Sequence, residues 1–188
     1  PHLAAAISVP PYDVVTFDEI KNEALNPKSF FHVTRSEIDL PDLKSPYVQR
    51  VYDKSAEALK SFVKQGWLVQ DPKESFYIYQ ETFQGRSQTG LVVLASLDEY
   101  KNNIIKKHEL TRKDKELDRV NHILTCKAQA EPVFLTIKPL AELKELFQKL
   151  MIAKNLRCDF VSQDQVTHKL WQVEETLDIK TITDLFSK

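Results

Sequence analysis

The sequence predicts an α+β fold with a mixed, mostly antiparallel sheet built from hairpins and several flanking helices. Two pairs of short segments, 75–83 with 88–96 and 157–161 with 166–173, are rich in β-branched and aromatic residues. Each pair is joined by a short polar turn, which is typical of a β-hairpin. Between the pairs, apolar residues recur at helical spacing. Hairpins separated by single helices favour an antiparallel sheet over a parallel one.

The N-terminal third begins with a segment that contains two consecutive prolines. Pro10 and Pro11 exclude a helix there and predict a rigid extended or turn segment. Thr16 and Glu19 have the spacing of a capping box, so a short helix is expected to about Leu25. The run 30–34 predicts a strand, and 47–65 predicts an amphipathic helix that ends at the following glycine.

The remaining elements follow in order after the first hairpin, whose turn is expected at residues 84–87. We predict a short helix from residue 96, a charged helix over 111–126 and a buried strand over 132–137. An amphipathic helix over 140–151 precedes the second hairpin, and 176–186 predicts a closing helix. The expected organisation is one domain over residues 1–188, itself part of a longer chain, with a boundary near 70–73 as an alternative.

Charge and composition exclude several classes of protein. The 188 residues carry 26 Lys plus Arg and 27 Asp plus Glu, a formal net charge of -1. Such a balance argues against a nucleic-acid partner and against a polybasic membrane-binding surface. Three glycines exclude every Gly-rich phosphate loop. Two cysteines are too few for a disulfide scaffold, and a reducing cytoplasm is the expected localisation.

The densest polar constellation lies at residues 106–122. On a helical wheel Leu117, Val120 and Leu124 share one side of the predicted helix, and the opposite side carries Arg112, Lys115, Arg119 and His122. A cationic face directly after His108-Glu109 suits an anionic ligand. The alternative is a solvated helix face with local ion pairs, such as Glu116 with Arg112.

A resident metal is not expected at these residues. The zincin pattern places a second histidine four positions after the first, and the residue four after His108 is Arg112. Cys126 follows His122 by one helical turn, but its place near the apolar stripe favours a packing role.

Two further polar sites precede this constellation. Tyr12 and Asp13 follow two prolines in a rigid loop, where they either bind a ligand or form a turn closed by the Asp side chain. Arg35 lies in a second polar cluster, together with His32, Glu37 and Asp39, in a loop where a site could lie.

The same motifs carry a family resemblance that covers almost the whole chain in order. The motifs include Pro10-Pro11-Tyr12-Asp13, Gln88-Thr89-Gly90, His108-Glu109-x-Thr111 and Asp118-Arg119-x-x-His122. They resemble the uncharacterised family catalogued as domain of unknown function 1015. Its members are usually longer, and a segment beyond the matched region is similar to ParB/sulfiredoxin-like nucleotide-binding domains, which include free-serine kinases.

This resemblance implies a cytoplasmic, serine-kinase-like phosphotransferase that uses ATP or ADP with magnesium. It implies that Glu109, next to His108, is the general base, and that Arg112, Arg119 and His122 meet phosphates or the amino-acid carboxylate. The reverse reaction and hydrolysis are equally compatible with these residues. The alternative function is a non-catalytic module that binds a nucleotide or a phospho-metabolite. The expected partner is a small molecule, and a homodimer remains open.

Overall fold

The computed structural model describes residues 2–12, 14–23, 25–43, 45–108, 110–153 and 156–187. The chain divides into two compact units, of which the first comprises Pro1–Ala5, Gln70–Ile105 and Leu135–Lys188. The second comprises Ala6–Val69 and Lys106–Phe134. One of the divisions, between Val69 and Gln70, falls beside residues 70–73. Helices and an antiparallel sheet make up the described parts, which confirms the α+β class.

The first unit contains a four-stranded sheet with the strand order β2-β1-β4-β3. Its strands are β1 (Phe76–Phe83), β2 (Arg86–Val92), β3 (Leu156–Val161) and β4 (Thr167–Val173), and each neighbouring pair is antiparallel. Both predicted hairpins are confirmed. Because β1 also pairs with β4, the two hairpins form one continuous sheet.

The turn between β1 and β2 is tighter than the predicted four residues. Only Gln84 and Gly85 lie between the strands, with φ angles of 48° and 76°. Positive φ at both positions gives a turn whose twist matches that of the flanking strands, and glycine adopts it without a steric penalty. Arg86 and Ser87 are therefore free to join β2.

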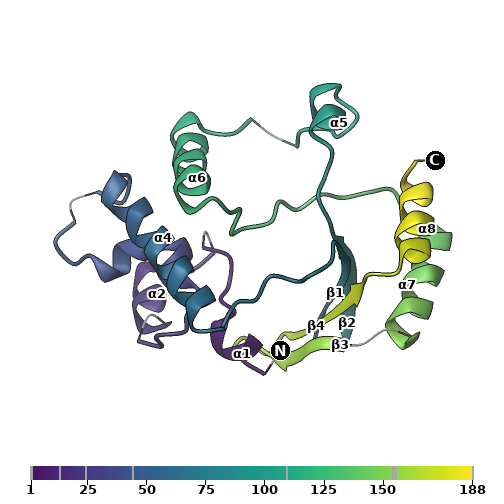
Figure 1. Cartoon of the computed structure of the whole chain (residues 1–188), viewed down its shortest axis with the longest axis horizontal. Helices are drawn as coiled ribbons and strands as arrows, with labels where there is room; N and C mark the ends of the chain where they lie inside the picture. Colours follow the sequence, from purple (N-terminus) through teal and green to yellow (C-terminus); the bar gives the residue numbers. More distant parts are fainter. Residues whose placement is uncertain are drawn as a thin grey trace. The chain divides into compact units, whose positions relative to one another are not determined.

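Two helices cover one face of this sheet, α7 (Ala141–Ala153) and α8 (Thr176–Phe186), and they lie side by side (Figure 1). Ile78 of β1 is opposite Leu91 of β2 and Trp171 of β4, so these side chains share a face. They pack with the apolar stripes of the two helices. The buried core consists of Ile78, Leu143, Phe147, Leu150, Trp171, Val173 and Ile182. The short helix α5 (Leu97–Lys101) also belongs to this unit.

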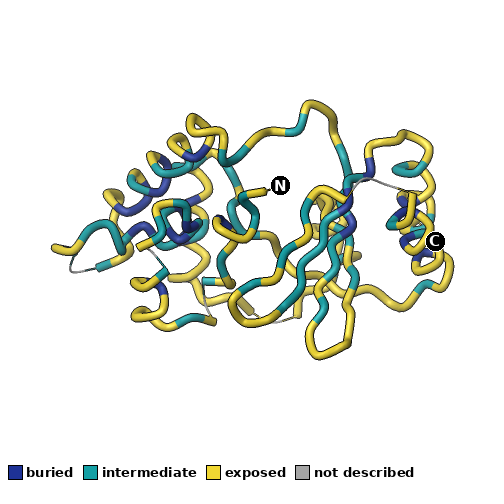
Figure 2. The backbone as a smooth tube through the Cα atoms, turned by 90° about the horizontal axis from the view of Figure 1, so that it is seen from below, coloured by how far each residue is buried: buried dark blue, intermediate teal, exposed yellow. Residues whose placement is uncertain are grey.

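The second unit is helical. Its elements are α2 (Phe17–Glu23), α3 (Phe31–Thr34), the 3-10 helix η1 (Ser36–Asp39), α4 (Gln49–Lys64) and α6 (Lys113–Cys126), and α1 (Ala4–Ile7) precedes them. The capping box is confirmed, because Thr16 N donates to Glu19 at 2.7 Å and Glu19 N to Thr16 Oγ1 at 3.3 Å. Buried and exposed positions alternate along α4 (Figure 2), as its amphipathic pattern predicts.

Two predicted strands are wrong. Residues 30–34 form α3, in which the amides of Thr34 and Arg35 donate to the carbonyls of Phe30 and Phe31. The described residues of its unit contain no strand, so local helical hydrogen bonds satisfy the backbone of this run instead. Residues 132–137 form no strand, and Phe134 is 79% exposed. They pass from the second unit to the first, where β-propensity alone does not supply a pairing partner.

Across the described residues, none of the helices combines the length and the apolar character needed to cross a bilayer.

The sheet core gives a direct test of the first unit. Ile78 is fully buried between two neighbouring strands and the two covering helices, so Ile78→Ala should lower the free energy of unfolding by about 2–5 kcal/mol. Urea denaturation followed by circular dichroism measures this change. Leu94→Ala, at a fully exposed position of the same unit, is the matched control and should change stability by less than about 0.5 kcal/mol. Equal effects at both positions would contradict the assignment of Ile78 to the core.

Candidate functional site

Helix α6 packs through a polar face. Asp118 and His122, one turn apart, are 8% and 4% exposed, whereas Leu117 and Leu124 are 61% and 58% exposed. Buried charges are tolerated in proteins only when they are paired and hydrogen-bonded. The contacts of this face therefore determine how α6 is held in the second unit.

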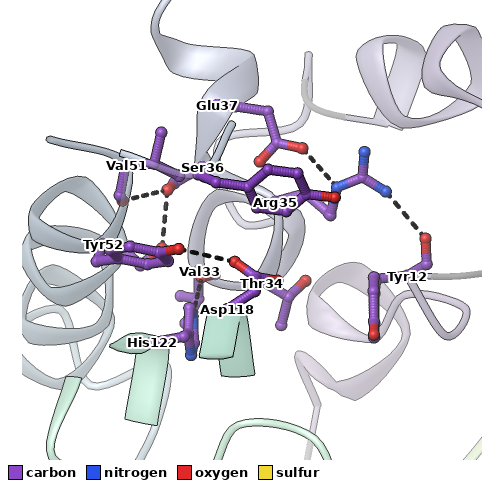
Figure 3. Close-up of polar contacts among 12 residues, drawn as sticks. Tyr12, Val33, Thr34, Arg35, Ser36, Glu37, Val51, Tyr52, Asp118 and His122 are labelled. Carbon is purple, nitrogen blue, oxygen red and sulfur yellow. Dashed lines mark hydrogen bonds and ion pairs between the residues drawn. The ribbon is translucent and has the colours of Figure 1, made fainter. Parts of the chain in front are cut away.

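Asp118 is the centre of these contacts. Its Oδ1 accepts a hydrogen bond from the Tyr52 hydroxyl of α4 at 2.9 Å (Figure 3). Its Oδ2 accepts from Nε and Nη2 of Arg119 at 3.2 and 2.8 Å. Arg119 Nη1 in turn donates to Glu131 at 2.7 Å. Asp118 and Arg119 together thus join α4, α6 and the segment that follows α6.

The electrostatics of this cluster follow from its burial. Burial raises the pKa of Tyr52, and the hydrogen bond to the Asp118 carboxylate raises it further. Burial alone would lower the pKa of Arg119, but the hydrogen bonds and negative charges of Asp118 and Glu131 outweigh it and raise that pKa. Tyr52 therefore stays a neutral donor, and Arg119 stays charged.

Tyr12 lies between two guanidinium groups. The Arg119 Cζ is 4.6 Å from the centre of the Tyr12 ring, a cation–π contact. Arg35 Nη1 donates to the Tyr12 carbonyl oxygen at 2.9 Å, and its Nε donates to Glu37 at 2.6 Å (Figure 3). Side chains 84 positions apart in the sequence thus converge on the proline-fixed segment.

His122 has a defined tautomer. Its Nε2 lies 2.9 Å from the Val33 carbonyl oxygen, so this nitrogen carries a proton and donates it (Figure 3). Cys126 Sγ is 3.8 Å from the same nitrogen, which therefore has no lone pair to accept the thiol proton. Burial also raises the pKa of the Cys126 thiol. The pair is thus not arranged as a nucleophile and its base.

A second polar contact joins η1 to α4. Ser36 Oγ is 2.7 Å from the Val51 carbonyl oxygen and 2.7 Å from Ser55 Oγ, and both serines are buried (Figure 3). Sequence reasoning missed Ser36, Ser55 and Tyr52 as members of the cluster. Their partners lie 15 to 66 positions away in the chain, beyond any local pattern.

The predicted site residues fall into three groups. Tyr12, Arg35, Arg119 and His122 lie in the contacts described above. Arg112 and His108 do not: Arg112 is 73% exposed and pairs with Asp114 at 2.6 Å, and His108 is exposed. Glu109 and Asp13 lie outside the described residues. Asp118 could have been found from its i, i+4 spacing to His122.

A pocket of about 410 Å³ adjoins Arg35 in the second unit. Its polar lining consists of Lys21, Arg35, Glu37 and Ser45. The apolar lining comes from α2, η1, Leu40, Pro41, Leu43 and Pro46. Its volume lies within the range of small-molecule sites.

Metal coordination has little support among the residues for which positions are described, since no three His, Cys, Asp or Glu side chains there are grouped to hold an ion. Both oxygens of Asp118 already accept hydrogen bonds. A magnesium ion at this site would therefore depend mainly on phosphate oxygens, as it does in many nucleotide complexes.

Comparison with protein-family models identifies a match over the whole chain. The family model described as "Protein of unknown function (DUF1015)" matches residues 1–188. No curated protein and no solved structure matches the chain.

The Tyr52–Asp118 bond can be tested by a double-mutant cycle. Tyr52→Phe leaves a buried carboxylate without one donor, so it should lower the free energy of unfolding by about 1–3 kcal/mol. Combined with Asp118→Ala, the two losses should not add, because both variants remove the Tyr52–Asp118 hydrogen bond. Tyr47→Phe is the matched control. It removes an exposed hydroxyl that meets Lys115 of α6 at 2.6 Å, and it should cost less than about 1 kcal/mol. Strict additivity would contradict the contact.

The raised pKa of Tyr52 predicts a pH dependence. A folded-state pKa above the ordinary value of 10.0 stabilises the fold below pH 10, and this contribution is lost as the pH rises through the folded value. The stability difference between wild type and Tyr52→Phe should therefore narrow from pH 10 upward. Urea denaturation of both proteins at pH 8 and at increasing alkaline pH measures it. A difference that stays constant would show that Tyr52 titrates equally in both states.

Proposed function

The chain belongs to the DUF1015 family of proteins of unknown function, and we propose that it transfers a phosphoryl group to the hydroxyl of a small metabolite such as L-serine. The observation that carries the proposal is the convergence of Arg35 and Arg119 on Tyr12. Two fixed guanidinium groups at one rigid segment suit the carboxylate or phosphate of a small ligand. The motif His108-Glu109 precedes the helix that carries Arg119.

In this proposal each residue has a separate role. Glu109 takes the proton from the substrate hydroxyl, whose oxygen then attacks the terminal phosphorus of ATP or ADP. The bond from that phosphorus to its bridging oxygen breaks, and the shortened nucleotide leaves. Magnesium, bound through the phosphates, would neutralise the charge that develops on them. Arg119 and Arg35 orient the anionic groups. The role of Glu109 and the use of a nucleotide are inferred from the similarity to free-serine kinases.

The charge of the cluster sets a condition on the ligand. Arg35 and Arg119 contribute two positive charges, whereas Glu37, Asp118 and Glu131 contribute three negative ones. A bare triphosphate would meet no excess of positive charge here, so the nucleotide must arrive with its cation. The direction of transfer does not alter this condition, because the same groups serve the reverse reaction.

A non-catalytic module that binds a nucleotide or a phospho-metabolite is the second candidate. The observation in its favour is that the guanidinium groups of the predicted site already have carboxylate partners. Arg112 pairs with Asp114, Arg119 with Asp118 and Glu131, and Arg35 with Glu37. Cations held in this way stabilise the fold and leave less of their charge for a transition state.

One experiment separates the two candidates. The chain is incubated with ATP or ADP, magnesium and L-serine, and O-phosphoserine is followed by phosphorus NMR. Product should form, and Glu109→Gln should reduce the rate by about 10²- to 10⁴-fold because the base is lost. Glu116→Gln, which removes an exposed carboxylate of α6, is the matched control and should leave the rate unchanged.

The outcomes have distinct meanings. An undiminished rate in Glu109→Gln would remove this residue from the mechanism. If calorimetry detects binding of the magnesium nucleotide and no product forms with either donor, the binding module is favoured and phosphoryl transfer is rejected.

A further inference from the structure

The pocket beside Arg35 presents a donor and an acceptor that the fold does not use. Arg35 and Glu37 are joined through a single contact, Nε to Oε1, and Arg35 Nη1 is taken by the Tyr12 carbonyl. Arg35 Nη2 and Glu37 Oε2 have no hydrogen-bond partner among the described residues. Within that part of the chain no buried side-chain nitrogen or oxygen lacks a partner, so both atoms must be accessible to solvent. Both side chains line the pocket.

The charge of the pocket wall is mixed. Lys21 and Arg35 contribute two cations, and Glu37 contributes one carboxylate. A ligand complementary to this wall carries a carboxylate for Arg35 and Lys21 and an ammonium group for Glu37. An anion without an ammonium group would leave the free oxygen of Glu37 desolvated and unpaired, which weakens binding.

The rest of the wall is apolar. It is formed by Phe17, Ile38, Leu40, Pro41, Leu43 and Pro46. The volume of about 410 Å³ exceeds what the charged ends of a zwitterion occupy, and the remaining space is bounded by these side chains. An apolar group of the ligand would gain free energy by leaving water there.

We propose that this pocket binds a free α-amino acid with a bulky apolar side chain. Its carboxylate accepts from Arg35 Nη2 and Lys21, its ammonium group donates to Glu37 Oε2, and its side chain packs against the apolar wall. The pocket shares Arg35 with the proposed phosphoryl-transfer site, but binding of an amino acid there does not depend on phosphoryl transfer. Because Arg35 also holds the Tyr12 carbonyl, occupancy of the pocket would act on the same segment that Arg119 contacts.

Calorimetric titration of the chain, with no nucleotide present, tests the proposal. L-leucine should bind. 4-Methylpentanoate, which lacks the ammonium group, and 3-methylbutylamine, which lacks the carboxylate, should each bind about 10- to 100-fold more weakly. L-serine, which has both charged groups but little apolar surface, should also bind at least about tenfold more weakly.

Two variants locate the binding. Glu37→Gln keeps an oxygen that can accept from Arg35 Nε but removes the charge, so it should weaken L-leucine about tenfold or more and leave 4-methylpentanoate unchanged. Asp42→Asn, the same change at an exposed position of the adjoining loop, is the control and should have no effect. Ser45→Trp should abolish binding by filling the pocket, and it tests the site if Glu37→Gln does not fold.

Three results would overturn the proposal: no binding of L-leucine, equal affinity for L-leucine and 4-methylpentanoate, or L-leucine binding that Ser45→Trp leaves intact. None of them bears on phosphoryl transfer, since the titration contains no phosphate donor and measures no product.

Discussion

A carboxylate removed from water must find donors, and the second unit is arranged around this requirement at Asp118. Tyr52 supplies one donor from α4, and Arg119 supplies two from the next position of α6. Breaking such a pair is costly because it leaves an uncompensated buried charge. The orientation of α6 is thereby fixed even though Leu117 and Leu124 remain exposed.

The contacts of Asp118 also help to position the segment around Tyr12, which lies outside the helices and strands. Arg119, held by Asp118 and Glu131, presents its guanidinium plane to the Tyr12 ring. Arg35, held by Glu37, binds the carbonyl of the same residue. The proline-rich entry is thus positioned from two sides by side chains whose rotamers are already fixed, which is the preorganisation that a binding site needs.

The sequence predicted the elements whose signal is local. Both hairpins, α4, α7 and α8 have a periodicity or turn that is complete within the element, and all of them are confirmed. The runs 30–34 and 132–137 have strand-like composition, but a strand also needs a neighbouring strand to pair with. Composition alone does not reveal whether such a neighbour exists. Composition therefore predicted a strand at both places and was wrong.

The packing of α6 shows the same limit at the level of the site. The helical wheel separated an apolar side from a cationic one, but the buried residues are Asp118 and His122, of which only His122 belongs to the cationic side. Their partners, the Tyr52 hydroxyl and the Val33 carbonyl, lie 66 and 89 positions away. Arg119 and His122 could be singled out as polar residues of one helix. Their binding to Asp118 and to a backbone carbonyl could not, because it depends on long-range contacts.

The division of the chain has a consequence for biosynthesis. Each unit is assembled from stretches that are interrupted by the other, so a ribosome cannot release a finished first unit before it makes the second. Helix α4 is translated well before α6. The hydrogen bond between Tyr52 and Asp118 can form only after the 65 residues between them have been translated. Closing such a long loop has an entropic cost, which slows the formation of this contact. Until α6 is available, the face of α4 that packs against it stays exposed to solvent. The interleaving therefore leaves the second unit incomplete until residue 134 has been translated.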